Sequence, residues 1–151
     1  MAKHSKNVFR EAVESTPEIK NCYQPGLRVL GKYSSKVTLT DTSLCNGSID
    51  IDECVKNKYP NSNRWDYCIG YNNLAYFVEV HSANTAEVST MLNKLQWLKD
   101  WLNNNATELN KIKASPPYYW VMSGKYAIPS TSPQSRRMAQ AGIKPTSRLN
   151  L

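Results

Sequence analysis

Two acids and an imidazole stand in the strongly apolar stretch of residues 64–81, where they could bind a metal ion. Strand-like alternation places Glu79 and His81 on one face of a sheet. A tight turn at residues 71–73 would fold the stretch into a hairpin and bring Asp66 beside them. Carboxylates among core residues are costly unless something compensates, and a metal ion is the usual compensation. The spacing therefore predicts a cation site that contains Asp66 and Glu79.

This donor set suits Mg²⁺ or Mn²⁺, because both ions bind carboxylates while keeping several water ligands. Asp50 is a further candidate metal ligand, since a strand expected over residues 44–52 would lie next to the hairpin. Glu11 or Glu14, from the first expected helix, could join the same site. Alternatively, Asp50 is a carboxylate that stabilises a turn.

Structural interpretations stay open for the central side chains as well. Asp66 could pair with Arg64 or cap a turn. Glu79 and His81 could form a hydrogen-bonded pair without any metal. Lys94, in the helix expected next along the chain, could be an ordinary solvated lysine.

Hydrophobic periodicity predicts the elements that must position these residues. Helices are expected over residues 7–20, 86–103 and 133–141, and strands over 36–40, 44–52, 64–70, 74–81 and 118–123. This order indicates an α/β fold with a mixed central sheet flanked by helices, in which the longest helix connects two parallel strands. Gly142 would end the last helix, and residues 143–151 are expected to fray.

Length and composition fit a single domain that spans residues 1–151. Residues 1–7 lack the apolar core of a signal peptide, and no stretch has the length of a membrane span, so a cytoplasmic location is expected. The four cysteines include no Cys-x-x-Cys pair, which argues against zinc and predicts reduced thiols packed as small apolar side chains. They are Cys22, Cys45, Cys54 and Cys68.

Positive charge is concentrated towards the C-terminal end. Residues 1–108 hold twelve basic and twelve acidic side chains, whereas residues 109–151 hold seven basic side chains and no acid. A segment of one charge fits a polyanionic partner, most simply nucleic acid. The alternative is a solvated basic tail. In the basic C-terminal segment, residues 124–151, the candidate nucleic-acid contacts are Lys125, Arg136, Arg137 and Lys144.

The order helix, three strands, helix, strand, with Asp66 and Glu79 on neighbouring strands, resembles the restriction-endonuclease-like, or PD-(D/E)XK, nuclease superfamily. Members of that family carry an Asp on the second core strand and a Glu-x-Lys on the third. Here Asp66 is followed thirteen residues later by Glu79-Val80-His81. The resemblance covers roughly residues 7–123 and implies Mg²⁺- or Mn²⁺-dependent hydrolysis of phosphodiester bonds in DNA or RNA.

The sequence departs from the family motif at His81, where the family has its catalytic Lys. In some members the following helix supplies that lysine, and the resemblance then implies Lys94. The lysine helps to polarise the attacking water and to stabilise charge on the phosphate, and His does part of this only when correctly protonated. The expectation is either a nuclease with a substituted or displaced lysine, or a scaffold without activity.

Three functions are compatible with these patterns. The first is a metal-dependent nuclease. The second is a catalytically inactive member of the same fold that binds nucleic acid or a protein partner, or forms a homodimer. The third is a small structural or inhibitor-type protein that uses exposed Trp and Tyr side chains as an interface. Trp97 and Trp101 are expected in the core or an interface rather than in a platform for stacking bases.

Overall fold

The computed structural model describes residues 6–151. Residues 1–5, and with them most of the stretch that bears on a signal peptide, lie outside the described part. Within residues 6–151, no helix combines the length and the apolar character needed to cross a membrane.

A mixed five-stranded sheet forms the centre of the fold. Its strands stand in the order β2 (Cys45–Asp50), β3 (Tyr67–Tyr71), β4 (Leu74–Asn84), β5 (Lys113–Ala127) and β6 (Ile143–Thr146). Strands β2, β3 and β4 pair antiparallel, whereas β4, β5 and β6 pair parallel. The predicted α/β class with a mixed sheet is therefore confirmed.

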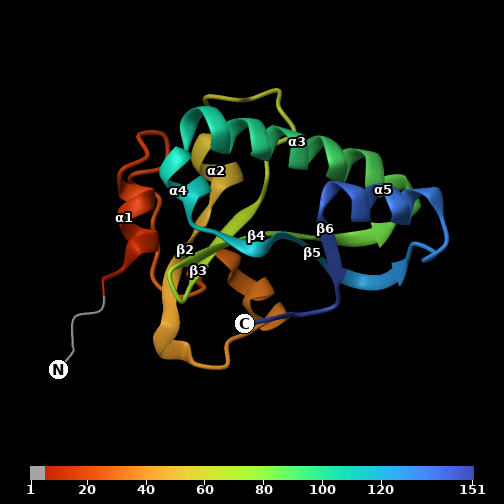
Figure 1. The fold of residues 1–151 in the computed structure, drawn as a ribbon, viewed down its shortest axis with the longest axis horizontal. Coiled ribbons are helices and arrows are strands. Elements are labelled where there is room, and N and C mark those ends of the chain that lie inside the picture. The colour runs from red at the N-terminus through yellow and green to blue at the C-terminus, as the bar shows by residue number, and fades with distance from the viewer. Residues whose placement is uncertain (1–5) are drawn as a thin grey trace.

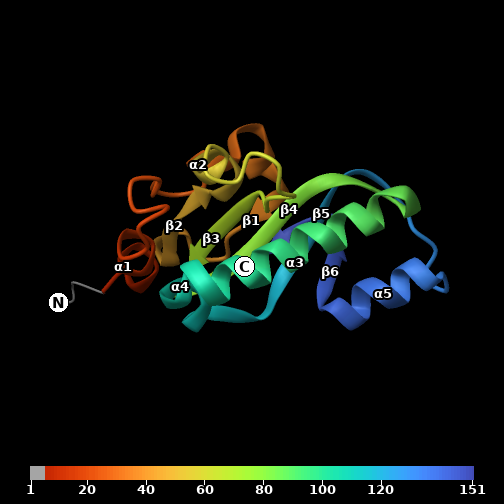
Figure 2. The same cartoon turned by 90° about the horizontal axis from the view of Figure 1, so that it is seen from above.

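Helices cover one face of this sheet. They are α1 (Val8–Glu14), α2 (Ile51–Val55), α3 (Val88–Asn105), α4 (Thr107–Lys111) and α5 (Pro133–Ala141). Three 3₁₀ segments lie in the connections before β1 (Val37–Thr38), β2 and α3: η1 (Arg28–Lys36), η2 (Thr42–Leu44) and η3 (Thr85–Glu87). In Figure 1, α3 and α5 lie above the sheet, and the C-terminus lies below it. Figure 2 shows α3 running along the sheet with α5 beside it.

The turn between β3 and β4 fixes the register of the predicted hairpin. Asn72 and Asn73 both have positive φ, 51° and 63°, as the right-handed twist of a two-residue hairpin requires. Tyr67 consequently pairs with Val78. Asp66, one residue before β3, is thereby placed next to Glu79.

Two apolar clusters pack against the sheet, one on each of its faces. The side chains that face α3 include Phe77 and Trp120, which pack against its buried leucines. The opposite face carries Val78 and Val80, which pack with Leu30 of η1. The predicted long helix is confirmed, and it does connect two parallel strands.

The C-terminal residues are ordered into strands, so the expected fraying of 143–151 is wrong. β6 extends the central sheet, and β7 (Leu149–Asn150) pairs with β1 (Val37–Thr38) in a separate two-stranded sheet. The helix over 133–141 is confirmed, with Gly142 in the left-handed conformation at its end. Periodicity cannot reveal β6 and β7, because each is only a few residues long and gains its hydrogen bonds from distant strands.

Two of the four cysteines are not reduced. Cys22 and Cys54 form a disulfide, with Cα atoms 6.3 Å apart across a sequence separation of 32 residues. The prediction of reduced thiols is therefore wrong for this pair. Local sequence spacing could not reveal the disulfide, because its two cysteines are far apart in the chain. Cys68 is free and buried, and Cys45 is free and half-buried.

Candidate metal centre

The three side chains predicted from the hairpin lie together. One potential ligand atom from each of Asp66, Glu79 and His81 lies within 4.8 Å of the other two. Nε2 of His81 is 3.2 Å from Oε1 of Glu79 and 3.9 Å from Oδ2 of Asp66. Glu79 on β4 and Asp66, directly before β3, therefore lie on a common side of the hairpin, as the alternation predicts.

Glu79 is the buried centre of this group. Its side chain is fully buried, next to Trp120, its neighbour in β5. Its Oε2 accepts a hydrogen bond of 2.6 Å from the backbone N–H of Asp66. A buried carboxylate needs such partners, because its desolvation is otherwise uncompensated.

Lys94 projects from α3 into the same group. Its Nζ donates to Oε1 of Glu79 at 2.7 Å and to Oδ1 of Asp66 at 3.3 Å, and lies 3.3 Å from Nε2 of His81. Only 12% of its side chain is exposed. The interpretation of Lys94 as an ordinary solvated lysine is therefore wrong.

The N-terminal end of α2 holds Asp66 in place. The backbone carbonyl of Asp66 accepts hydrogen bonds from the N–H groups of Ile51, at 2.8 Å, and Asp52, at 3.4 Å. Arg64 pairs with Asp52 at 2.8 Å rather than with Asp66. The carboxylate of Asp66 is consequently left to face Lys94 and His81.

The clustered charges shift the pKa values of three members. Burial, together with the neighbouring Glu79 carboxylate, raises the pKa of Asp66 to about 7. The hydrogen bond with Glu79 raises the pKa of His81. Burial alone would lower the pKa of Lys94, but the carboxylates of Glu79 and Asp66 outweigh it and raise that pKa overall.

The donor set fits a divalent cation. Two carboxylates suit Mg²⁺ or Mn²⁺, and the imidazole is a common ligand for transition metals. Ligands bound at 2.0–2.1 Å in an octahedron are about 3–4 Å apart, so atoms within 4.8 Å of one another need only small adjustments. The residues present could therefore hold either ion.

The other candidate acids lie outside this group. Oδ1 of Asp50 accepts from the backbone N–H of Glu53 and caps α2. Burial raises the pKa of Asp50, and Glu79 is near enough to add to that rise. Glu11 and Glu14 are exposed on α1, where Glu14 pairs with an arginine of the same helix and Glu11 with a lysine just before it. The strand expected over 44–52 ends at Asp50, because α2 begins at the next residue.

The predicted nucleic-acid contacts are spread over several surfaces. Arg136 and Arg137 are exposed on α5, beside α3. Lys144 pairs with Tyr119 across β5 and β6, and so lies on the face opposite Glu79 and Trp120. Lys125 is exposed near the end of β5. The structure therefore does not gather these four side chains into one patch.

The two tryptophans of α3 belong to the packed part of the molecule. Their rings stack with centroids 5.6 Å apart and an interplanar angle of 9°. Trp101 is buried and donates from Nε1 to Glu18, while Trp97 contacts Tyr59 edge-on. The sequence predicts Trp97 and Trp101 in the core or an interface: Trp101 is buried in the core, and Trp97 is half-buried against it.

Sequence reasoning missed the contribution of α2, whose backbone amides anchor Asp66. It also gave no role to Lys99, which lies five residues after Lys94 on α3. Neither has a signal in the sequence, because both depend on which elements lie side by side. No family model, no curated protein and no solved structure matches the chain, so the candidate site rests on its geometry.

Proposed function

We propose that the protein is a metal-dependent nuclease that hydrolyses phosphodiester bonds of DNA or RNA. The observation that carries the proposal is the meeting of two carboxylates, Asp66 directly before β3 and Glu79 on β4, with the ammonium of Lys94 from the following helix. The order of α1, β2 to β4, α3 and β5 supports a restriction-endonuclease-like core. In this proposal Lys94 performs the function of the motif lysine, while His81 occupies the position of that lysine in the sequence motif.

Each residue then has a defined task. Asp66 and Glu79 would hold Mg²⁺ or Mn²⁺, and His81 would be a third ligand or orient the attacking water. The bound ion would polarise a phosphodiester oxygen and lower the pKa of a water ligand. Lys94 donates to the phosphate oxygen on which negative charge grows. The attacking water gives up one proton to solvent as its oxygen bonds to phosphorus, the bond from phosphorus to the leaving sugar oxygen breaks, and that oxygen takes up one proton from solvent.

Cleavage assays with the full chain test this proposal. Plasmid DNA, single-stranded DNA and RNA are each incubated with Mg²⁺ or Mn²⁺, with a chelator as the blank. We expect Glu79→Gln to reduce cleavage by at least about 100-fold, because removing a direct ligand should cost no less than removing a residue that only supports a ligand, which costs about 10- to 100-fold. Glu108→Gln, an exposed acid paired with Lys111, is the matched control and should cleave normally.

Absence of cleavage, cleavage that does not depend on metal, or equal activity of the Glu79 and Glu108 variants would reject the metal-dependent nuclease. If no cleavage is found, the second candidate is a catalytically inactive member of the same fold that binds nucleic acid or a protein. It is favoured by one observation: the ammonium of Lys94 already lies within hydrogen-bonding distance of all three candidate metal ligands. Salt-dependent binding of nucleic acid without any cleavage would support it.

A cytoplasmic setting is part of the same proposal. The Cys22–Cys54 disulfide weighs against it, because cytosolic thiols are normally kept reduced. Thiol alkylation followed by mass spectrometry, on protein taken directly from its cells, decides the matter. Fully alkylated Cys22 and Cys54 would support the cytoplasm, and an intact disulfide would contradict it.

A further inference from the structure

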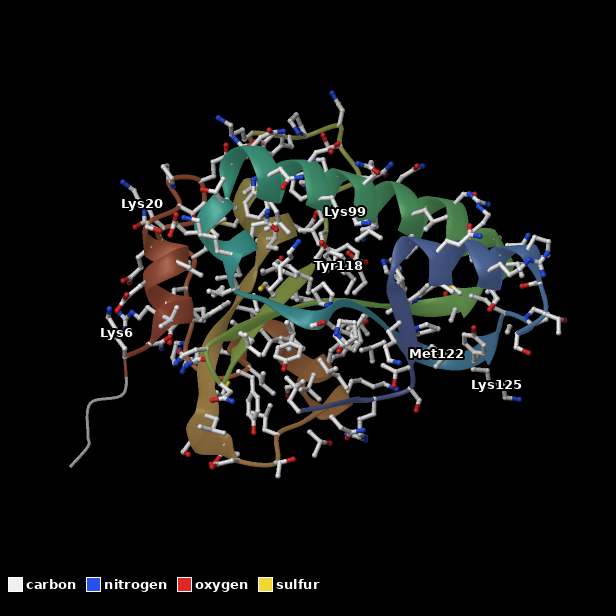
Figure 3. The ribbon with its side chains drawn as sticks, viewed as in Figure 1. Lys6, Lys20, Lys99, Tyr118, Met122 and Lys125 are labelled. Carbon is white, nitrogen blue, oxygen red and sulfur yellow. A yellow bond between two sulfur atoms is a disulfide. The ribbon has the colours of Figure 1, made fainter. Side chains whose placement is uncertain are left out.

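A polar pocket of about 300 Å³ opens along the half of α3 that follows the metal centre. It is lined by side chains from α3, α4 and β5: Lys99, Asn103, Asn110, Lys113 and Tyr118. Figure 3 labels Lys99 on α3 above Tyr118 on β5. Since five helical residues span about 7.5 Å and about 140° of rotation, Lys94 and Lys99 leave α3 from different sides. The pocket is therefore distinct from the metal centre.

Within the described part of the chain, no acidic side chain lines this pocket. Among residues 6–151, neither Lys99 nor Lys113 takes part in an ion pair. Lys111, which is close in sequence, is instead neutralised by Glu108 at 2.8 Å. The pocket therefore carries two positive charges that no carboxylate in its lining offsets.

The ammonium of Lys99 is held in position. It donates to the backbone carbonyl of Ala141 at 3.1 Å, where α5 ends, and lies 5.5 Å from the centre of the Tyr118 ring. Both contacts favour a cation, because carbonyls at a helix C-terminus and aromatic faces are electronegative. An ammonium has three donors, so two remain for a ligand.

Amide groups add further donors to the lining. Nδ2 of Asn110 donates to Oδ1 of Asn103 at 3.0 Å, which orients both side chains. With this orientation, the free N–H groups of Asn103 and the second N–H of Asn110 remain available. Two ammonium groups and several amide donors without a carboxylate suit an anion that has many acceptor oxygens.

We propose that this pocket binds a phosphate group. Its source is either the backbone of a nucleic acid or a free phosphate, and both present the same oxygens to Lys99 and Lys113. The proposal does not require cleavage at Asp66 and Glu79, so a failed nuclease assay leaves it standing. Conversely, a failure to detect phosphate binding here would not count against the metal-dependent reaction at Asp66 and Glu79.

Titration calorimetry on the full chain tests the inference, with inorganic phosphate and a single-stranded oligonucleotide as separate probes and no divalent metal present. We expect Lys99→Met and Lys113→Met each to weaken binding about tenfold or more, as loss of a hydrogen bond to a charged group predicts. Lys111→Met, which removes equal charge beside the pocket, is the matched control and should bind normally. Lys99→Arg, which keeps the charge, should retain most of the affinity even if Lys99→Met is less stable.

The two probes distinguish the sources. Binding of phosphate but not of the oligonucleotide identifies a free anion as the ligand, and the reverse identifies the nucleic-acid backbone. If the nucleic-acid backbone is the ligand, the plot of log K against log salt should become shallower by about 0.7 in each variant, because one phosphate contact with the single strand is lost. No binding of either probe, or equal effects of the Lys99 and Lys111 variants, would overturn the proposal.

Discussion

Nζ of Lys94 lies 2.7 Å from Oε1 of Glu79, and this oxygen is also 3.2 Å from Nε2 of His81. The ammonium therefore stands among the same donor atoms that a divalent ion would use. Two cations cannot share that position, because their mutual repulsion is strong in a buried site. We infer that metal binding at this group requires the Lys94 side chain to move away from Glu79.

Replacing Lys94 by Met tests this competition. We expect the metal-free variant to lose about 3 kcal/mol of unfolding free energy, since two buried carboxylates lose their counter-charge. Its Mn²⁺ affinity should rise about tenfold, or about 1.4 kcal/mol, while cleavage is lost. Urea unfolding and calorimetry with Mn²⁺ measure these effects, and Lys20→Met, an exposed lysine, serves as the control. Weaker Mn²⁺ binding by Lys94→Met would show that the ammonium assists the ion rather than competing with it.

The raised pKa of Asp66 predicts a pH-dependent stability. Its pKa is about 7 in the folded protein and about 3.9 in an unfolded chain, so the folded state binds more protons between these values. The stability from this group is complete below about pH 4 and is lost as the pH rises through 7. Because one pKa unit corresponds to about 1.4 kcal/mol, the loss is at most about 4 kcal/mol.

Asp66→Asn should remove this dependence, because the amide does not titrate. We expect the variant to be more stable than the wild-type protein at about pH 8, by an amount that shrinks towards about pH 4. Urea unfolding across this range provides the measurement, with Asp100→Asn on the exposed side of α3 for comparison. Parallel pH profiles for wild type and Asp66→Asn would contradict the assigned pKa.

Asp50 can be tested as a helix cap and as a metal ligand separately. Asp50→Asn keeps an oxygen that accepts from Glu53, so folding should be preserved. Asp50→Ala should cost about 1 kcal/mol of unfolding free energy, as the loss of a cap usually does. If Asp50 only caps α2, calorimetry will find the same Mn²⁺ affinity in Asp50→Asn and wild type. A large loss of affinity would instead restore Asp50 as a ligand.

The disulfide should stabilise the fold near the candidate metal centre. Cys54 lies in α2, whose first amides hold the carbonyl of Asp66. Closing a loop of this length is worth about 3–4 kcal/mol on the chain-entropy model. We therefore expect Cys22→Ser to unfold at lower urea concentration, and dithiothreitol to lower the stability of wild type but not of the variant. Cys45→Ser, which alters a free thiol, should respond to dithiothreitol as wild type does.

The sequence by itself determined the pairing of Asp66 with Glu79 and His81. Alternation along a strand and the positive φ values favoured by Asn72 and Asn73 are local rules, so they place these side chains on one face without knowledge of the rest of the fold. The long helix and the α5 boundary at Gly142 were predictable for the same reason.

Tertiary structure alone decided how that group is completed. Whether Lys94 points at Glu79 or into solvent depends on how α3 is rotated above the sheet, and that rotation is set by packing of its buried side chains against Phe77 and Trp120. The Cys22–Cys54 disulfide and strand β6 likewise join segments that are far apart in the chain. Local propensity carries no information about such contacts, because their free energy comes from surfaces that meet only once the chain has folded.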